Sequence, residues 1–87
     1  MNYFITGASG FIGRRLVEKL LQRQDSHVYY LILERELPMA EQLRQRWGTA
    51  ANRTFPIVGD LTRPRLGVSD ADLARLKGNI HHLFHLA

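Results

Sequence analysis

Near the start of the chain, a glycine-rich segment separates an apolar run from a stretch with helical spacing. The segment reads GASGFIG over residues 7–13, with a glycine at every third position. The apolar run 2–6 precedes it, and apolar residues from Phe11 onward recur at helical intervals. A glycine turn between a strand and a helix is typical of open parallel α/β sheets that bind phosphate groups at that helix start. This context therefore predicts the fold class and a ligand site together.

Each glycine of this turn has a separate expected role. Gly7 permits a sharp turn out of the strand, Gly10 lets a pyrophosphate approach the backbone, and Gly13 allows the helix to pack close to the sheet. Unpaired amides at the helix start, with a hydroxyl donor from Ser9, would hold the phosphates of a dinucleotide. A turn that only allows tight packing is the alternative, because the spacing is G-x-x-G-x-x-G rather than G-x-G-x-x-G. The candidate cofactor-binding residues here are Gly7, Ser9, Gly10, Phe11, Ile12 and Gly13, and the Phe11 side chain is expected under the turn.

The rest of the chain alternates between strand-like and helix-like patterns. We expect strands over residues 2–6, 28–33, 54–58 and 80–86, helices over 11–24, 38–48 and 69–78, and loops over 50–53 and 62–67. Pro56 favours an edge position for the third strand. The βαβαβαβ order predicts a right-handed, doubly wound, Rossmann-like parallel α/β sheet with strand order 3-2-1-4. The expected inner faces of the helices are Ile12, Leu16 and Leu20 with Val17 and Leu21 beside them, then Ala40, Leu43 and Trp47, then Leu73 and Leu76.

The amino-acid composition of the chain excludes several classes of function. The 87 residues contain no cysteine, which excludes disulfides, cysteine nucleophiles and cysteine metal ligands. Twelve Lys and Arg against eight Asp and Glu give a net charge of +4 without a block of like charges. We therefore expect attraction to an anionic cofactor and no binding of nucleic acid. No secretory leader or membrane-spanning stretch is visible, so the sequence predicts a cytoplasmic protein.

Three segments, in order, resemble the extended short-chain dehydrogenases/reductases. This family includes nucleotide-sugar epimerases, flavonoid-type carbonyl reductases and thioester or fatty-acyl reductases. The segments are TGASGFIG at 6–13, VGDL at 58–61 and HLFHLA at 82–87, so the resemblance spans the chain. It implies that Asp60 and Leu61 contact the adenine, and that His85 and Ala87 lie along the cofactor. From the sequence pattern alone, an Asx turn that closes the strand end is the alternative for Asp60.

The residues after the second expected strand bear on the choice of cofactor. A carboxylate there accepts the ribose hydroxyl of NAD, and an arginine accommodates the 2′-phosphate of NADP. Glu34 lies about twenty residues after Gly13, near the spacing expected for the NAD carboxylate, and Arg35 follows it. The similar reductases have an arginine at the end of this strand, where this chain has Leu33. Arg14 and Arg35 can still supply positive charge, so NADP or NAD fits, with a lean to NADP. A solvated turn is the alternative for Glu34 and Arg35.

The histidines near the end of the chain do not have the spacing of a metal site. A strand rises about 3.3 Å per residue, which places His81 about 13 Å from His85, while His82 faces the opposite side. No metal site is therefore expected. His85 is expected to shape the cofactor cleft, and Tyr29 and Tyr30 belong to the core or the sheet face.

The catalytic pair of the family does not occur in this sequence. The resemblance implies hydride transfer assisted by a Tyr-x-x-x-Lys pair, but the tyrosines here are followed four residues on by Gly7, Leu33 and Glu34. We therefore expect no catalytic residue. We interpret residues 1–87 as the N-terminal part of a longer NAD(P)-binding domain, whose parent acts on a carbonyl, alcohol or acyl substrate.

Two other functions fit the sequence. A non-catalytic member of the family that binds dinucleotide as a sensor or scaffold is the main alternative, and a basic interaction module without cofactor is the other. An incomplete sheet would leave an unpaired edge strand, which predicts self-association or marginal stability.

Overall fold

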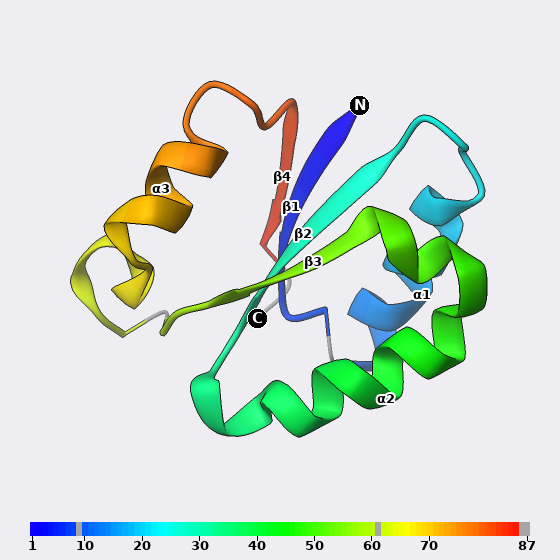
Figure 1. Cartoon of the computed structure of the whole chain (residues 1–87), viewed down its shortest axis with the longest axis horizontal. Helices are drawn as coiled ribbons and strands as arrows, with labels where there is room; N and C mark the ends of the chain where they lie inside the picture. The colour runs from blue at the N-terminus through cyan, green and yellow to red at the C-terminus, as the bar shows by residue number, and fades with distance from the viewer. Residues whose placement is uncertain (9, 61, 86–87) are drawn as a thin grey trace.

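The computed structural model describes residues 1–8, 10–60 and 62–85, so the predictions for Ser9, Leu61, Leu86 and Ala87 lie outside the described residues. Within this part of the chain, four parallel strands form one sheet in the order β3-β2-β1-β4. The strands are β1 (Asn2–Thr6), β2 (His27–Ile32), β3 (Thr54–Val58) and β4 (His82–His85). Figure 1 shows the sheet crossing the middle of the molecule. The predicted α/β class and strand order are confirmed.

Helices cover both faces of this sheet. Helices α1 (Phe11–Leu21) and α2 (Leu37–Trp47) lie on one face, and α3 (Asp70–Leu76) lies on the other (Figure 1). Short 3-10 helices η1 (Glu34–Glu36), η2 (Gly48–Arg53) and η3 (Pro64–Gly67) occupy connections, including parts of the two segments expected as loops. Among the described residues, no helix is long and apolar enough to cross a membrane.

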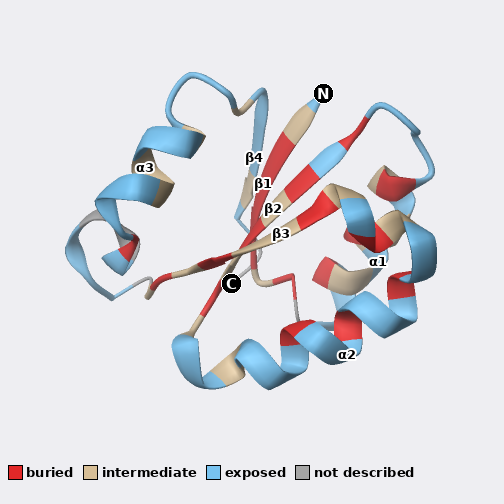
Figure 2. Ribbon diagram, viewed as in Figure 1, coloured by how far each residue is buried: buried red, intermediate tan, exposed pale blue. Residues whose placement is uncertain are grey.

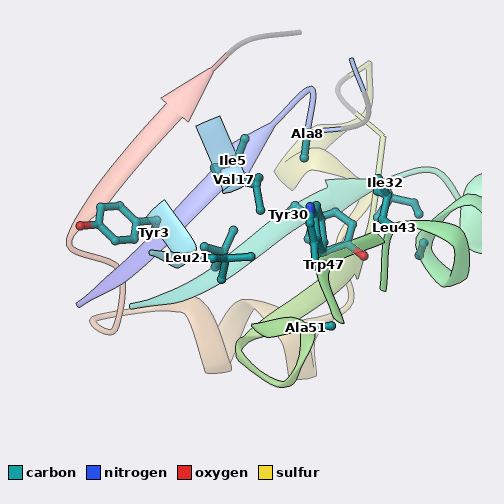
Figure 3. Packing of buried hydrophobic residues seen from close by; sticks show 12 residues of the cluster. Tyr3, Ile5, Ala8, Val17, Leu21, Tyr30, Ile32, Leu43, Trp47 and Ala51 are labelled. Atoms are coloured by element: carbon teal, nitrogen blue, oxygen red, sulfur yellow. The ribbon is translucent and has the colours of Figure 1, made fainter. Parts of the chain in front are cut away.

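The main core lies between the sheet and helices α1 and α2. Ile5, Val17 and Val28 are fully buried there, and Figure 3 shows side chains from strands and helices meeting in this layer. The expected inner face of α2, formed by Ala40, Leu43 and Trp47, is confirmed. Burial of these apolar side chains is the main source of stability in a chain of this size.

The opposite face of the sheet has a thinner cover. Its buried cluster consists of Phe4, Ile57 and Val68, with Leu73 and Leu76 of α3 only partly buried against it. Helix α3 contains no buried residue, and Figure 2 shows it mostly exposed. The inward orientation predicted for Leu73 and Leu76 is right, but this layer contributes much less buried surface than the first.

The predicted inner face of α1 is confirmed for Leu16, Val17, Leu20 and Leu21 and wrong for Ile12. Gly13, Val17 and Leu21 are buried, Leu16 and Leu20 are partly buried, and the Ile12 side chain is 68% exposed. Gly13 lies against the backbone of the preceding turn, and this close contact sets the rotation of the helix. The buried stripe therefore begins at Gly13, which hydropathy alone does not single out.

Helix α1 also ends at Leu21 rather than at Gln24. The carbonyl of its last residue, Leu21, accepts from Arg53 Nη2 at 2.7 Å, and the carbonyl of Arg23, just beyond the helix, accepts from Arg53 Nη1 at 2.6 Å. Nη1 also donates to the carbonyl and the hydroxyl of Ser26, at 3.1 and 2.9 Å. A side chain distant in sequence thus satisfies the end of the helix.

The strand ends differ slightly from the prediction. Strand β2 spans 27–32 because Leu33 already begins the η1 turn, where its amide donates to Glu36 Oε1 at 3.0 Å. Strand β4 begins at His82 rather than Ile80, and His81 Nδ1 accepts a hydrogen bond from the Asn2 amide at 2.9 Å. Pro56 lies on edge strand β3, as predicted.

Candidate functional site

The glycine turn leaves β1 at the carboxyl edge of the sheet. Gly7 has φ of 82°, in the left-handed region that favours glycine. The Gly10 amide donates to Gly7 O at 3.1 Å, which closes the turn. The expectation that Gly7 permits the sharp turn is confirmed.

Gly13 has no room for a side chain. A Cβ built there would lie 2.0 Å from Gly7 O and 2.8 Å from Ala8 Cα, both of which are backbone atoms. The expected close approach of the helix is therefore present, but its partner is the backbone of the turn. Glycine at this position is required by the fold itself.

The local structure does not require glycine at position 10. Gly10 has φ of −73° and ψ of 169°, which any residue adopts, and a Cβ there would meet Gly7 O at an ordinary contact distance of 3.4 Å. Gly10 is the N-cap of α1 and has no side-chain cap hydrogen bond, and the first turn contains no acidic residue. In the described part of the chain, no side chain occupies the anion-binding position of this helix start.

The side chains of Phe11 and Ile12 point into solvent. They are 70% and 68% exposed, so the expected packing of Phe11 under the turn is wrong. Gly13 already fills that space with its backbone, and the Phe11 ring instead lies 5.6 Å from the guanidinium carbon of Arg15. Phe11 and Ile12 can contribute to a phosphate site only through their amides.

A second part of the site is an open pocket of about 480 Å³ beside the carboxyl ends of β2 and β3. It brings together three residues that the sequence predicted as ligand contacts, Glu34, Arg35 and Asp60. Because the strands are parallel, the pocket and the glycine turn lie at the same edge of the sheet. The remaining lining residues are Leu33, Val58, Gly59, Arg63 and Gly67.

Asp60 is held by the residues that follow it. Its Oδ1 accepts hydrogen bonds from the Thr62 amide at 2.9 Å and the Thr62 hydroxyl at 2.7 Å. These hydrogen bonds lower the pKa of Asp60, with smaller contributions from the positive charges of Arg63 and Arg35. The Asx turn, which was the alternative for Asp60, is therefore present, and it orients an ionised acceptor in the pocket. The contact of Asp60 with adenine stays a prediction.

Glu34 and Arg35 lie on the short η1 turn after β2. Both side chains are exposed, and the turn is closed by Glu36, whose amide donates to Leu33 O at 2.8 Å. Within the described residues, neither the Glu34 nor the Arg35 side chain is fixed by a hydrogen bond or a close ion pair. Each can reorient toward a ligand in the pocket.

The third part of the site is the end of β4. His85 pairs with Thr6 in the sheet register, and His85 Nδ1 lies 2.6 Å from the Thr6 hydroxyl oxygen. The other two histidines of this segment have different partners: His81 accepts from the Asn2 amide, and the His82 ring stacks on the Tyr3 ring with centroids 5.4 Å apart. Within residues 1–8, 10–60 and 62–85, no three His, Asp or Glu side chains group as a metal site would need.

Comparison with known proteins identifies the family. The family described as male sterility protein, an NAD-binding family, matches residues 5–87. The chain belongs to the male sterility protein family. The resemblance to extended short-chain dehydrogenases/reductases is thereby confirmed. The chain is an NAD(P)-binding segment of the reductase type.

Several relatives of this male sterility family member are large proteins. It is 37% identical to a linear gramicidin synthase of Brevibacillus parabrevis over 93% of this chain and 2% of that protein. It is 31% identical to fatty acyl-CoA reductase 1 of Xenopus laevis over 99% of this chain and 20% of that protein. The chain thus spans a small share of the relatives it matches.

A solved structure agrees with the fold. The terminal R domain from the myxalamid PKS-NRPS biosynthetic pathway matches with a TM-score of 0.81 and 29% identity, over 99% of this chain and 24% of that chain. The overall fold of this male sterility family member is therefore shared with a reductase-type domain.

Two residues of the pocket, Arg63 and Gly67, were not predicted from the sequence. The pattern of segment 62–67 indicates only a loop, although the segment follows Asp60 closely and contains a proline and a glycine. The signal that could have found them is the position of this loop after a parallel strand, where ligands of open α/β sheets bind.

Proposed function

We propose that this chain binds an NAD(P) dinucleotide as the cofactor segment of a reductase. One observation carries the proposal. The uncapped start of α1, with a glycine at position 10 that the fold does not require, lies at the same sheet edge as the pocket containing Asp60. The helix start would bind the pyrophosphate of the dinucleotide, and the pocket would bind its adenosine.

The proposed contacts divide along the sheet edge. The amides of Gly10 to Gly13, with the Ser9 hydroxyl, bind the pyrophosphate. Asp60 and Leu61 contact the adenine, and Glu34 and Arg35 lie beside the adenosine ribose. His85 and Ala87 lie along the nicotinamide half, near the ends of β1 and β4.

NADP is the proposed cofactor rather than NAD. Arg35 lines the pocket with Glu34 directly after β2, at the position where a 2′-phosphate is recognised in this class of fold. Leu33, directly after this strand, has no charge, so the proposed preference for NADP depends on arginines at neighbouring positions.

The proposed reaction of the whole protein is reduction of a carbonyl or acyl substrate by hydride transfer. The name of the fatty acyl-CoA reductase relative supports this class over a non-catalytic sensor. Residues 1–87 contain no Tyr-x-x-x-Lys pair, so we propose that the cofactor-binding part alone does not turn substrate over and that its catalytic proton donor lies elsewhere in the enzyme.

Titration of the chain with NADH and NADPH, followed by nicotinamide fluorescence, tests the proposal. Saturable binding of either cofactor is expected, with tighter binding of NADPH, and ADP should compete. Absence of saturable binding at millimolar concentrations would refute dinucleotide binding. A preference for NADH above tenfold would refute the NADP assignment while leaving dinucleotide binding intact.

The exposed edge of β4 supports a proposal about association. In the described sheet, β4 is an edge strand and its Leu83 side chain is 66% exposed, whereas the other edge strand is interrupted by Pro56. A proline in an edge strand hinders its pairing with a strand of another molecule, and β4 contains no proline. The chain should therefore self-associate, and sedimentation that stays monomeric across concentrations would contradict this.

A further inference from the structure

We infer that Arg63 is a specificity-determining residue that binds the 2′-phosphate of NADP(H). The inference rests on the proposed function, because it assigns a ligand group within the same pocket. The sequence predicts recognition of this phosphate at the position after β2, whereas Arg63 lies in the loop after β3.

The position of Arg63 brings a second guanidinium to the pocket. Arg63 lines it from the loop after β3, and Glu34 and Arg35 line it from the end of β2. The Arg63 amide donates to Asp60 O at 3.1 Å, so the residue is part of the turn that orients the Asp60 carboxylate. The Arg63 side chain nevertheless remains 72% exposed.

Gly67 leaves room for the stem of this side chain. Gly67 has φ of +61°, and a Cβ there would lie 3.3 Å from both Arg63 Cδ and the Asp60 amide nitrogen. The loop therefore closes tightly beneath Arg63. A side chain at position 67 would press on the Arg63 stem, whereas glycine leaves the exposed guanidinium of Arg63 able to reach a ligand in the pocket.

The guanidinium has donors left for a ligand. Asp60 Oδ2 lies 4.0 Å from Arg63 Nε, which is too long for a hydrogen bond. Asp60 accepts instead from Thr62 through its other oxygen. By contrast, the guanidiniums of Arg46, Arg53 and Arg75 each donate hydrogen bonds within the protein.

Charge balance indicates the ligand group. Glu34 and Asp60 contribute two negative charges to the pocket, and Arg35 and Arg63 contribute two positive charges. Without Arg63 the pocket would be net negative and would repel a phosphate. A planar guanidinium binds phosphate through paired, charge-assisted hydrogen bonds, whereas the free hydroxyl of NAD needs no such partner.

The experiment compares 2′,5′-ADP with 5′-ADP on the full chain by calorimetry. These two probes both contain adenosine and no nicotinamide, and only the first contains a 2′-phosphate. Arg63→Ala should weaken binding of 2′,5′-ADP about 10- to 100-fold, as expected for a charge-assisted contact, and change binding of 5′-ADP by less than about twofold. Arg63→Lys should restore part of the loss.

Arg75→Ala is the matched control, because it removes an exposed arginine on α3 outside the pocket. It should leave both affinities unchanged. A second variant, Arg63→Gln, preserves much of the length of the side chain and should reproduce the selective loss if the alanine variant is poorly folded.

The outcomes separate the inference from the proposed function. Equal weakening of both probes by Arg63→Ala would mean that Arg63 only supports the turn, and the inference would be wrong. Binding of 5′-ADP without any preference for the 2′-phosphate would also overturn it and leave dinucleotide binding standing. If the wild-type chain binds neither probe nor NADH, both proposals fail together.

Discussion

The Thr6 hydroxyl oxygen and His85 Nδ1 lie 2.6 Å apart, which joins the carboxyl ends of β1 and β4. Thr6 is 3% exposed and immediately precedes the glycine turn. A side-chain hydrogen bond at this point aligns the strand from which the turn departs with the strand proposed to lie along the nicotinamide.

Thr6→Val is expected to remove this bond while keeping the shape of the side chain. The free energy of unfolding should fall by about 1 kcal/mol, the usual net contribution of one hydrogen bond. Chemical denaturation measures the loss. Thr6→Ser, which keeps the hydroxyl, is the control for the bond, and a loss in Thr6→Ser with none in Thr6→Val would assign the contribution of Thr6 to packing of its methyl group.

Gly10 and Gly13 should respond to alanine in opposite ways. Gly13→Ala places a Cβ 2.0 Å from Gly7 O, so it should destabilise the fold by several kcal/mol or prevent folding, as overpacking against backbone does. Gly10→Ala should fold with a stability within about 1 kcal/mol of the wild type, but bind NADPH more weakly. Denaturation and cofactor titration of both variants check this, and unimpaired binding by Gly10→Ala would argue against close approach of a phosphate.

Arg53 should be a strong determinant of stability. Its guanidinium donates to the carbonyls of Leu21, Arg23 and Ser26, so Arg53→Ala removes the donor from the partly buried Leu21 and Ser26 carbonyls and should cost about 2–4 kcal/mol. Arg46→Ala is the control. Its ion pair with Glu18 is 2.7 Å long but lies between side chains that are 56% and 39% exposed, so the cost should stay below about 1 kcal/mol. Similar losses in the two variants would contradict this account.

Tyr30 predicts a loss of stability at high pH. Burial raises the pKa of its phenol from 10.0 to about 12, although the charge of Arg44 acts in the opposite direction. Because the folded pKa lies above the unfolded value, the native state retains the proton more strongly between these two pH values. This contribution is complete below pH 10 and is lost as the pH rises toward about 12.

Tyr30→Phe tests this dependence. The Tyr30 hydroxyl is buried without a hydrogen-bond partner in the described part of the chain, so its removal should leave stability at neutral pH equal or slightly higher. The contact with the Trp47 ring, whose centroid lies 5.7 Å from that of Tyr30, would be kept. Denaturation at pH 10 and above should show a smaller decline in the variant, and an unchanged decline would assign it to other groups.

The fold was predictable because its pattern is repeated along the chain. Each strand is a short apolar run, each helix has helical spacing, and parallel strands joined by helices allow few arrangements. Pro56 even indicated the edge of the sheet correctly. What hydropathy could not supply was the burial of Gly13 in place of Ile12 on α1, because glycine has no side chain to register in a hydrophobic pattern.

The site was predictable in part for a similar reason. Asp60, Glu34 and Arg35 follow strands, and the carboxyl ends of parallel strands meet at one edge, so their meeting in a pocket follows from the topology. Arg63 and Gly67 lie in an irregular segment. Their approach depends on a positive φ and a turn geometry that no periodic pattern encodes.

The unequal covering of the two sheet faces has a consequence for how a ligand would be received. The glycine turn is anchored in the well-filled layer under α1, whereas the loop containing Asp60 and Arg63 precedes the thinly covered α3. Local opening should therefore be frequent in the loop containing Asp60 and Arg63 and rare at the glycine turn. A dinucleotide that contacts both would bind first at the rigid glycine turn and would then order the loop around its adenosine. The free energy needed to order that loop would reduce the observed affinity.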